Sequence, residues 1–437
     1  MPGATVRCGL NPDTTISARS KSDTARGIDG CSVPFRDASG GCGNVARKVR
    51  GAARFAPCRI PAADVPTVPA ATQVYDHPSP AGQLPLRILR ICLAVLAFAI
   101  GIAPDASAQT PTLTLSLFER YLDTLRVQAG IPGMSAAVVQ NGVVVWERGL
   151  GRQDVAGNVA ATPDTPYAIG GMSQALTSTL LLRKCIDQSY VSTLDPVQRW
   201  FAAFAEPDTL IGHLLAHAAP GGGYKYDLGR FASLTPVIES CTSTTLPDLL
   251  TSDLFEPLAM FSSIPGAALI APTPDDRNVF SPEQLARFGD VLRRTAVPYR
   301  VVNGRATRSD VAAAPITMST GIVTTVRDLA RFDLALRDDI LLAPATRLAA
   351  WTNVSVGGVP LPTGLGWFVQ NVDGEAVVWS FGGIKDAWSS LILKLPNRDV
   401  TFILLANSDG LSAPFALENG DVTTSAFAKL FLKLLTL

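Results

Sequence analysis

The sequence predicts an α+β protein in which strands come first, helices occupy the middle and strands return at the end. Three observations lead to this prediction: strand-like runs joined by Asn141-Gly142, helical periodicity through the middle of the chain, and further strand-like runs near Gly382, Ser390 and Leu405. The chain has 437 residues, of which 47% are hydrophobic. It therefore has enough apolar material for a large core.

The first expected element is a helix over residues 115–128, where apolar residues recur at helical spacing before a Gly and a Pro end the pattern. Strands at residues 134–140 and 143–148 follow. They are joined by Asn141-Gly142, a dipeptide that suits a tight hairpin because both central residues need positive φ.

The segment before this helix has a different composition. Residues 1–85 hold four of the seven cysteines and no sustained apolar periodicity, so we expect a disordered extension or a mis-assigned start of translation. Residues 86–108 have a basic start, about 13 apolar residues where a bilayer span needs roughly 20, and an Ala-x-Ala end. This pattern predicts a secretory signal peptide cleaved after Ala108, and the alternative is an internal membrane-associated helix. The remaining domain, residues 109–437, is then secreted or periplasmic, with no stable membrane anchor.

Charge and cysteine content narrow the function classes. Of the 37 basic and 37 acidic residues, 12 and 7 lie in the first 108, so the remainder carries 25 and 30 and is mildly acidic. It has no basic stripe, and we expect no nucleic acid partner. Only Cys185 and Cys241 follow residue 108, each on an expected helix. They form either a disulfide or two isolated buried thiols.

Several short motifs occur in order after residue 115. They are residues 130–133 (GIPG), 167–178 (YAIGGMSQALTS), 194–197 (LDPV), 211–217 (IGHLLAH), 319–332 (STGIVTTVRDLARF) and 364–367 (GLGW). In this order the chain resembles the β-lactamase-related serine hydrolases, which include class C β-lactamases, D-alanyl-D-alanine carboxypeptidases and related esterases. The resemblance covers about residues 115–435. It implies an antiparallel sheet flanked by helices, a helical subdomain, and a pocket at their junction.

In that family a Ser attacks the carbonyl, and a Lys one helical turn later takes its proton. The family segment reads roughly F-R-I-G-S-V-T-K. Aligned without a gap, its Ser position is Gly171 and its Lys position is Gln174. Glycine has no nucleophile and glutamine takes no proton near neutral pH. The resemblance therefore implies the frame of the active site without its acyl-transfer chemistry.

The other two family motifs are also altered. The Y-x-N motif is represented by Tyr226 and Leu228, and the K-T-G motif by Ser380 and Gly382, followed by Gly383. In the family, backbone N–H groups at the nucleophile position and on the third-motif strand form an oxyanion hole, and such donors survive the loss of side chains. We therefore expect a pocket that holds a carbonyl or carboxylate without reacting with it.

Other residues are candidates for substitute chemistry. Ser173 would need a base three residues later and has none, so a helix-surface or packing role is expected. Lys385 is a possible accessory cation or a solvated loop residue. His213 and His217 have metal-ligand spacing on one face of an expected helix, but they lack the Glu of zincins. In the family these His positions are structural. Residues 221–223 (GGG) stand where the family's T-S-G-L loop is nearly deleted, and no phosphate-loop Lys follows them.

The sequence therefore predicts an exported member of this family that is a ligand-binding or regulatory pseudo-enzyme, with no metal and no cofactor. The expected ligand is a small molecule, a peptide or a cell-wall fragment, and a protein partner is left open. The alternative is an active hydrolase of β-lactams, D-Ala peptides or esters that uses a substitute nucleophile.

Overall fold

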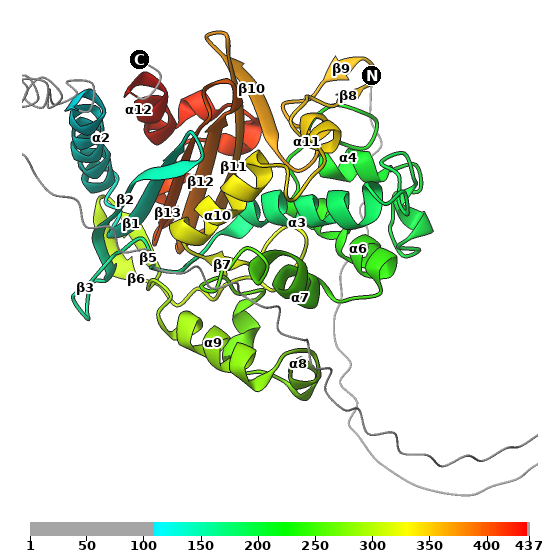
Figure 1. The fold of residues 1–437 in the computed structure, drawn as a ribbon, viewed down its shortest axis with the longest axis horizontal. Coiled ribbons are helices and arrows are strands. Elements are labelled where there is room, and N and C mark those ends of the chain that lie inside the picture. The colour runs from blue at the N-terminus through cyan, green and yellow to red at the C-terminus, as the bar shows by residue number, and fades with distance from the viewer. Residues whose placement is uncertain (1–108, 435–437) are drawn as a thin grey trace, which may run out of the picture. The chain divides into compact units, whose positions relative to one another are not determined.

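The structure is a computed structural model that describes residues 109–434 (Figure 1). The expected extension and signal peptide, residues 1–108, lie outside the described residues. Helix α2 (Gln109–Gln128) leads into the hairpin of β1 (Gly133–Gln140) and β2 (Val143–Asp154), as the sequence predicts. Asn141 and Gly142 have φ values of 51° and 79°, the two positive angles that this turn requires.

The hairpin belongs to one antiparallel sheet with strand order β10-β11-β12-β13-β1-β2-β3. The C-terminal strands thus return to pair with the N-terminal hairpin, and Met134 on β1 stands opposite Ala406 on β13. The other strands of this sheet are β3 (Val159–Ala160), β10 (Phe368–Val372), β11 (Glu375–Ile384), β12 (Trp388–Leu395) and β13 (Val400–Ala406). The expected α+β arrangement is confirmed.

The sheet has a hydrophobic core on each face. Along β1, Ala136 and Val138 contribute to one core, whereas Ala137 and Val139 contribute to the other. This alternation follows from the two-residue period of a strand. Helix α2 and the C-terminal helix α12 (Ala426–Leu434) cover the first core (Figure 1).

Helices and short strands between β3 and β10 cover the other face. The α-helices are α3 (Ser173–Leu181), α4 (Ile211–Leu215), α5 (Leu228–Ala232), α6 (Thr235–Thr242), α7 (Leu246–Leu249), α8 (Pro274–Val279), α9 (Pro282–Arg293), α10 (Val326–Arg337) and α11 (Pro344–Ala350). The short strand pairs are β4 (Tyr167–Ala168) with β7 (Val323–Thr324), β5 (Tyr299–Val302) with β6 (Arg305–Arg308), and β8 (Ser355–Val356) with β9 (Val359–Pro360).

Short 3-10 and π turns complete the connections. They are η2 (Gly170–Met172), η3 (Leu182–Ile186), η4 (Val197–Arg199), η5 (Leu250–Phe255), η6 (Ala267–Ile270), η7 (Pro396–Arg398), η8 (Asp409–Leu411), η9 (Leu417–Asn419) and η10 (Val422–Thr424). Cys185 on η3 and Cys241 on α6 form a disulfide with a Cα–Cα distance of 6.1 Å. Of the two states that the sequence leaves open, the structure has the paired one.

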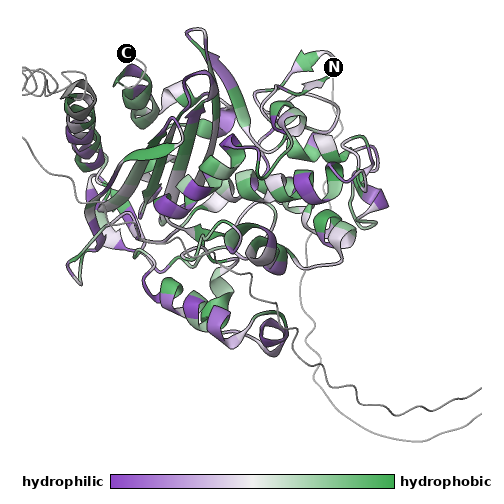
Figure 2. Cartoon of the chain, in the orientation of Figure 1, coloured by the Kyte–Doolittle hydropathy of each residue, from purple (hydrophilic) through white to green (hydrophobic). Residues whose placement is uncertain are grey.

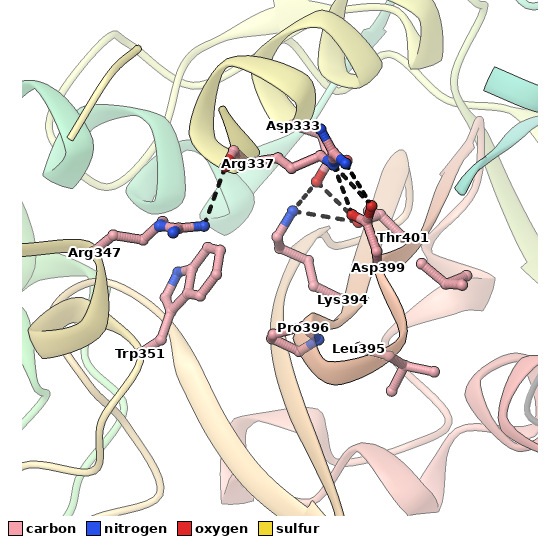
Figure 3. Close-up of a pocket in the computed structure, with 10 residues that line it drawn as sticks. Asp333, Arg337, Arg347, Trp351, Lys394, Leu395, Pro396, Asp399 and Thr401 are labelled. Atoms are coloured by element: carbon pink, nitrogen blue, oxygen red, sulfur yellow. Dashed lines mark hydrogen bonds and ion pairs between the residues drawn. The ribbon is translucent and has the colours of Figure 1, made fainter. Parts of the chain in front are cut away.

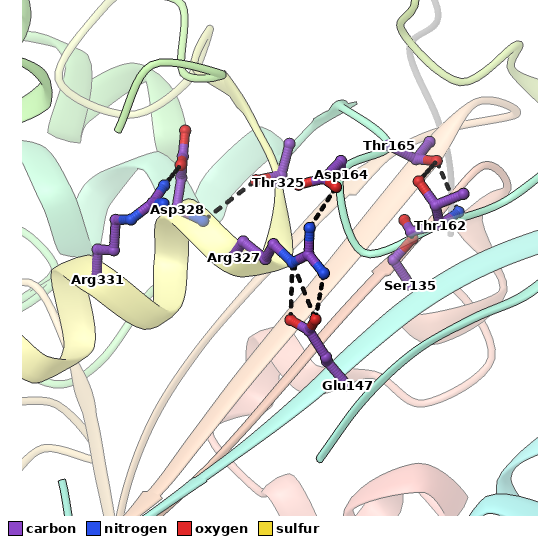
Figure 4. Close-up of polar contacts among 9 residues, drawn as sticks. All are labelled: Ser135, Glu147, Thr162, Asp164, Thr165, Thr325, Arg327, Asp328 and Arg331. Atoms are coloured by element: carbon purple, nitrogen blue, oxygen red, sulfur yellow. Dashed lines mark hydrogen bonds and ion pairs between the residues drawn. The ribbon is translucent and has the colours of Figure 1, made fainter. Parts of the chain in front are cut away.

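Ion pairs attach helix α10 to its surroundings (Figure 4). Thr325 caps the helix by accepting from the backbone N–H of Asp328. Arg327 forms hydrogen-bonded ion pairs with Glu147 on β2 and with Asp164 in the turn before β4. Asp328 is buried and pairs with Arg331. These contacts fix the start of α10 against both the sheet and the segment that leads to Gly171.

A hollow of about 320 Å³ lies where α10 and α11 meet the turn between β12 and β13 (Figure 3). Buried Lys394 there pairs with buried Asp333, and Thr401 donates to the same carboxylate. The charges that line this hollow are paired with one another or with adjacent residues, among them Arg337 with Asp399. The cluster therefore ties helix α10 to the sheet.

The hydropathy of the described residues follows this packing. Apolar residues predominate along the central strands, and hydrophilic residues predominate on α8 (Figure 2). Among residues 109–434, no helix has both the length and the apolar content needed to cross a membrane.

Candidate functional site

The segment that resembles the nucleophile motif lies between the sheet and the helical layer. Strand β4 leads through Gly170, whose φ is 53°, into turn η2 and then helix α3. The backbone of Ile169 donates to Ile322 O and accepts from the Ser390 hydroxyl at 2.7 Å. Turn η2 is therefore held against strands β11 and β12.

The approach of η2 to β11 explains Gly382. A Cβ built on Gly382 would lie closer than 3.0 Å to Ile169 O and 2.9 Å from Gly171 N, so no side chain fits there. A Cβ built on Gly170 would lie 3.2 Å from Gly383 N. The backbone nitrogens of Gly171, at the position aligned with the nucleophile, and of Gly383, on the third-motif strand, therefore both lie along the close contact between η2 and β11.

The space beside Gly171 is already filled. A Cβ built on Gly171 would lie closer than 3.0 Å to the Tyr226 hydroxyl, 3.2 Å from Phe381 O and 3.4 Å from Leu228 Cδ2. Leu228, the first residue of α5, stands where the family motif has Asn. The second-motif tyrosine thus occupies the volume in which a serine side chain would stand.

Aromatic packing fixes the half-buried side chain of Tyr226. Its ring stacks on Phe381 at 5.2 Å between centroids and lies 4.6 Å from the His217 ring. Burial raises the pKa of Tyr226 above its usual range, and the negative charge of Glu418 adds to the rise. Its phenol therefore stays protonated at neutral pH and does not serve as a base.

His217, whose ring contacts Tyr226, also forms a hydrogen bond with Gln174 that the sequence does not reveal. The His217 Nε2 and Gln174 Oε1 atoms are 3.1 Å apart, and Asp227 N donates to His217 Nδ1 at 3.2 Å. Burial lowers the pKa of His217 to about 3, so the ring is neutral. Because Nδ1 accepts, Nε2 carries the proton and donates to the Gln174 oxygen.

The third-motif strand contributes backbone and one nearby cation. Ser380 is buried on β11, and Gly382 and Gly383 pair with Ser390 and Ser389 of β12. Lys385 follows this strand and is exposed. It does not replace the family's Lys or His at position 380, but it does line the adjoining pocket.

That pocket has a volume of about 360 Å³. Its lining residues are Tyr226, Leu228, Phe381, Gly383, Lys385, Asp409, Ser412, Ala413 and Glu418. It has an aromatic wall and three charged side chains. No hydrogen bond joins Ser412 to Lys385; Ser412 Oγ instead lies 3.4 Å from Asp409 O. The described lining thus combines apolar and polar binding groups without a hydrogen-bonded nucleophile and base.

Ser173 lies away from the pocket. It is buried, and its hydroxyl oxygen accepts from Ile322 N at 3.3 Å. Asp227, next to Tyr226, caps α5 by accepting from Arg230 N and lies 3.7 Å from Lys225 Nζ. Both residues have structural contacts that account for them.

The expectation that two histidines share a helix face is wrong. Helix α4 ends at Leu215, and His217 has a φ of 52°, so the chain leaves the helix before that residue. His213 Nδ1 accepts from Leu210 N at the start of the helix, whereas His217 turns toward Gln174. Among the described residues, no group of side chains has a metal-binding arrangement.

The residues missed by sequence reasoning come from distant parts of the chain. Asp409, Ser412 and Glu418 follow β13, in a segment that matches no motif, yet they line the pocket. The contact of Tyr226 with the Gly171 position was missed because the motif assigns the tyrosine a role in proton transfer. For both the pocket lining after β13 and the Tyr226 contact, the one hint in the sequence is that Gly171 lacks the serine side chain.

The fold and the order of motifs define a serine-hydrolase scaffold, and the resemblance aligns Gly171 with its nucleophile position. The Beta-lactamase family model matches residues 118–423, and the chain belongs to the β-lactamase-related serine hydrolase family.

Curated relatives include D-aminopeptidases. The D-aminopeptidase of Brucella canis is 28% identical to this chain over 197 residues, and the match covers 36% of this chain and 38% of the relative. That of Brucella anthropi is 28% identical over 193 residues, 36% of this chain and 37% of the relative. The match thus spans less than two fifths of the length of these relatives.

Solved structures share the fold. An octameric penicillin-binding protein homologue from Pyrococcus abyssi has a TM-score of 0.58 and 18% identity, over 73% of this chain and 77% of the other. A D-amino acid amidase from Ochrobactrum anthropi has a TM-score of 0.56 and 16% identity, over 73% of this chain and 98% of the other.

Proposed function

We propose that this chain is a pseudo-enzyme whose family cleft binds a ligand without acylation. One observation carries the proposal: the volume of the missing serine side chain beside Gly171 is filled by the Tyr226 hydroxyl. A tyrosine with a raised pKa is a poor nucleophile at neutral pH. Gln174, at the position of the base, accepts a hydrogen bond from His217 and takes up no proton.

The adjoining pocket supports a small polar ligand or the end of a peptide. Its aromatic wall suits an apolar group, and Lys385, Asp409 and Glu418 offer ionic contacts. The names of the similar proteins, D-aminopeptidase and D-amino acid amidase, favour ligands that contain amino acid amides or short peptides. A cell-wall fragment fits the same description.

The proposal includes export to the periplasm or the medium. The basic, apolar and Ala-x-Ala pattern of residues 86–108 supports this location. The disulfide between Cys185 and Cys241 adds support, because such bonds persist in oxidising compartments. N-terminal sequencing of the protein recovered outside the cytoplasm should give a chain that starts at Gln109; a chain that retains residues 86–108 would reject cleavage.

Intact-mass spectrometry tests the absence of acylation. The full chain is incubated with a penicillin and, separately, with a fluorophosphonate, and we expect no adduct. Gly171→Ser with Gln174→Lys, with and without Tyr226→Phe, is tested beside it, because these changes restore the nucleophile and base and the third removes the obstructing hydroxyl. A stoichiometric adduct on the unmodified chain would overturn the proposal.

A second candidate function is hydrolysis with a substitute nucleophile. Ser412 favours this second function because it lines the pocket and lies directly beside Gly383. A Cβ built on Gly383 would lie 3.3 Å from Ser412 Cβ and closer still to the Ser412 hydroxyl oxygen. The same mass spectra decide between the two functions. Peptide mapping that places an adduct on Ser412, and its loss in Ser412→Ala, would establish this second function.

A further inference from the structure

The hairpin of β5 and β6 has one buried face and one exposed face. In its register Arg300 stands opposite Thr307, and Val302 stands opposite Arg305. Because side chains alternate along a strand, these four residues share a face. All four are exposed, whereas Tyr299, on the other face, is buried. The arginines therefore lie on the side of the hairpin that faces away from the domain.

Contacts of the inner face hold the hairpin beside the end of β2 (Figure 1). The Tyr299 hydroxyl accepts from the backbone N–H of Val155 at 2.7 Å, and Tyr299 N donates to Asn407 O at 2.8 Å. A Cβ built on Gly130, just after α2, would lie 2.8 Å from Val301 Cγ1 and 3.2 Å from Gly304 Cα. The tip of the hairpin thus lies against the end of α2, and its outer face has a fixed direction relative to the domain.

The positive charge of the hairpin is unbalanced. Among the described residues, no carboxylate forms an ion pair with Arg300, Arg305 or Arg308, and all three side chains are exposed. Residues 299–308 contain these three arginines and no acidic residue, although residues 109–437 as a whole carry 25 basic and 30 acidic residues. A domain with a net negative charge therefore presents a purely cationic hairpin, which is complementary to an anionic surface.

Exposed valines border the arginines. Val302, next to the tip, is 52% exposed, and Val127, in the last turn of α2, is 61% exposed. Gly130 N donates to Val127 O, and the same Gly130 meets the hairpin tip, so the end of α2 that carries Val127 borders the hairpin. Apolar side chains beside cations suit the boundary between lipid headgroups and acyl chains. A nucleic acid would bind the arginines through its phosphates but offers no apolar phase to the valines.

We propose that the outer face of the β5–β6 hairpin docks this protein reversibly on a membrane that contains anionic phospholipid. Arg300, Arg305 and Arg308 pair with lipid phosphates, and Val302 enters the headgroup boundary. An arginine close to such a surface strengthens binding about fivefold, so three of them strengthen it about a hundredfold. This docking is independent of the proposed function of the cleft, because it uses no residue of the cleft.

Vesicle sedimentation tests the proposal. The protein is taken in the form recovered from the cell, and every variant is compared in that same form, so that any contribution of residues 86–108 is common to all. Binding is measured on vesicles of phosphatidylcholine alone and of equal parts phosphatidylcholine and phosphatidylglycerol. We expect at least about a tenfold preference for the anionic vesicles at 0.1 M salt and its loss at 1 M salt, where the screening length falls from about 10 to about 3 Å. Equal binding to both kinds of vesicle would overturn the proposal.

Charge variants locate the binding surface. Arg300→Gln with Arg305→Gln should weaken binding to the anionic vesicles at least about tenfold, since each arginine contributes about fivefold. Lys429→Gln with Lys433→Gln is the matched control, because it removes the same charge from exposed side chains of α12. It should leave the affinity nearly unchanged. An equal loss in the two double variants would show that the vesicles respond to net charge, and the hairpin would not be the docking surface.

Val302→Ser separates a bilayer from other anionic partners. It should weaken binding to the anionic vesicles about threefold, because less apolar surface enters the headgroup boundary. Binding of the same variant to heparin, which has no apolar phase, should stay unchanged. If Val302→Ser binds the vesicles as tightly as the unmodified chain, the arginines act on any polyanion and the membrane proposal is wrong. Tighter binding to duplex DNA than to anionic vesicles at the same salt would likewise replace the membrane by a nucleic acid partner.

Discussion

A methyl group at Gly171 provides the most direct test of the filled cleft. In Gly171→Ala the new Cβ would lie closer than 3.0 Å to the Tyr226 hydroxyl, where ordinary contacts begin at 3.4 Å. The tyrosine must therefore move by at least about 0.4 Å, against a ring that stacks on Phe381 and contacts His217. Overpacking of this kind costs about 1–3 kcal/mol of unfolding free energy.

The assay is urea unfolding of the full chain in a double-mutant cycle with Tyr226→Phe. Because Phe lacks the obstructing hydroxyl, Gly171→Ala should cost less than about 1 kcal/mol in that background, which gives a coupling of about 1–2 kcal/mol. Phe381 O lies 3.2 Å from the same Cβ and explains a residual cost. If Gly171→Ala destabilises both backgrounds equally, the tyrosine does not fill the space beside Gly171, and the observation that carries the proposed function is wrong.

Three further predictions concern stability. The pKa of His217 is about 3 in the folded chain and about 6.5 in the unfolded chain, so the unfolded state binds more protons at pH values between these two. The unfolding free energy should therefore fall by up to about 1.4 kcal/mol for each pH unit below 6.5. The difference in unfolding free energy between the unmodified chain and His217→Phe should shrink over this range, and a constant difference would contradict the shift. Lys394→Met leaves the buried Asp333 carboxyl group without its ion-pair partner and should cost about 3–5 kcal/mol of unfolding free energy in urea. Most of this loss should be recovered in Lys394→Met with Asp333→Leu, and a loss below about 1 kcal/mol in the single variant would reject the argument. Cys185→Ala with Cys241→Ala removes a bond between cysteines 56 residues apart and should lower the stability by about 4 kcal/mol, whereas an unchanged melting temperature in reducing and oxidising buffer would show that the bond does not form.

The sequence predicts the elements whose signals are local. Asn141-Gly142 specifies the hairpin because the turn needs positive φ at both residues, and the predicted helix before it is present as α2. The order of motifs also predicts the position of Gly171 at the entrance to a helix. These features depend on residues close together in the chain.

The filling of the cleft depends on residues that are far apart in the chain. Tyr226 meets Gly171 from 55 positions away, and His217 meets Gln174 from 43 positions away. No local sequence pattern predicts contacts between residues so far apart in the chain. The helix pattern around His217 was misleading for a related reason, since the backbone leaves the helix to make the long-range contact.

Gly382 limits how this chain can be modified in the laboratory. Its missing side chain allows two stretches of backbone to touch, Ile169 from the helical layer and β11 from the sheet. Any larger residue would force these layers apart, whether or not a reaction takes place between them. The glycine is thus a spacer that the architecture needs, and its presence says nothing about turnover. If the proposed function is correct, attempts to introduce catalysis should leave Gly382 unchanged and begin with Tyr226.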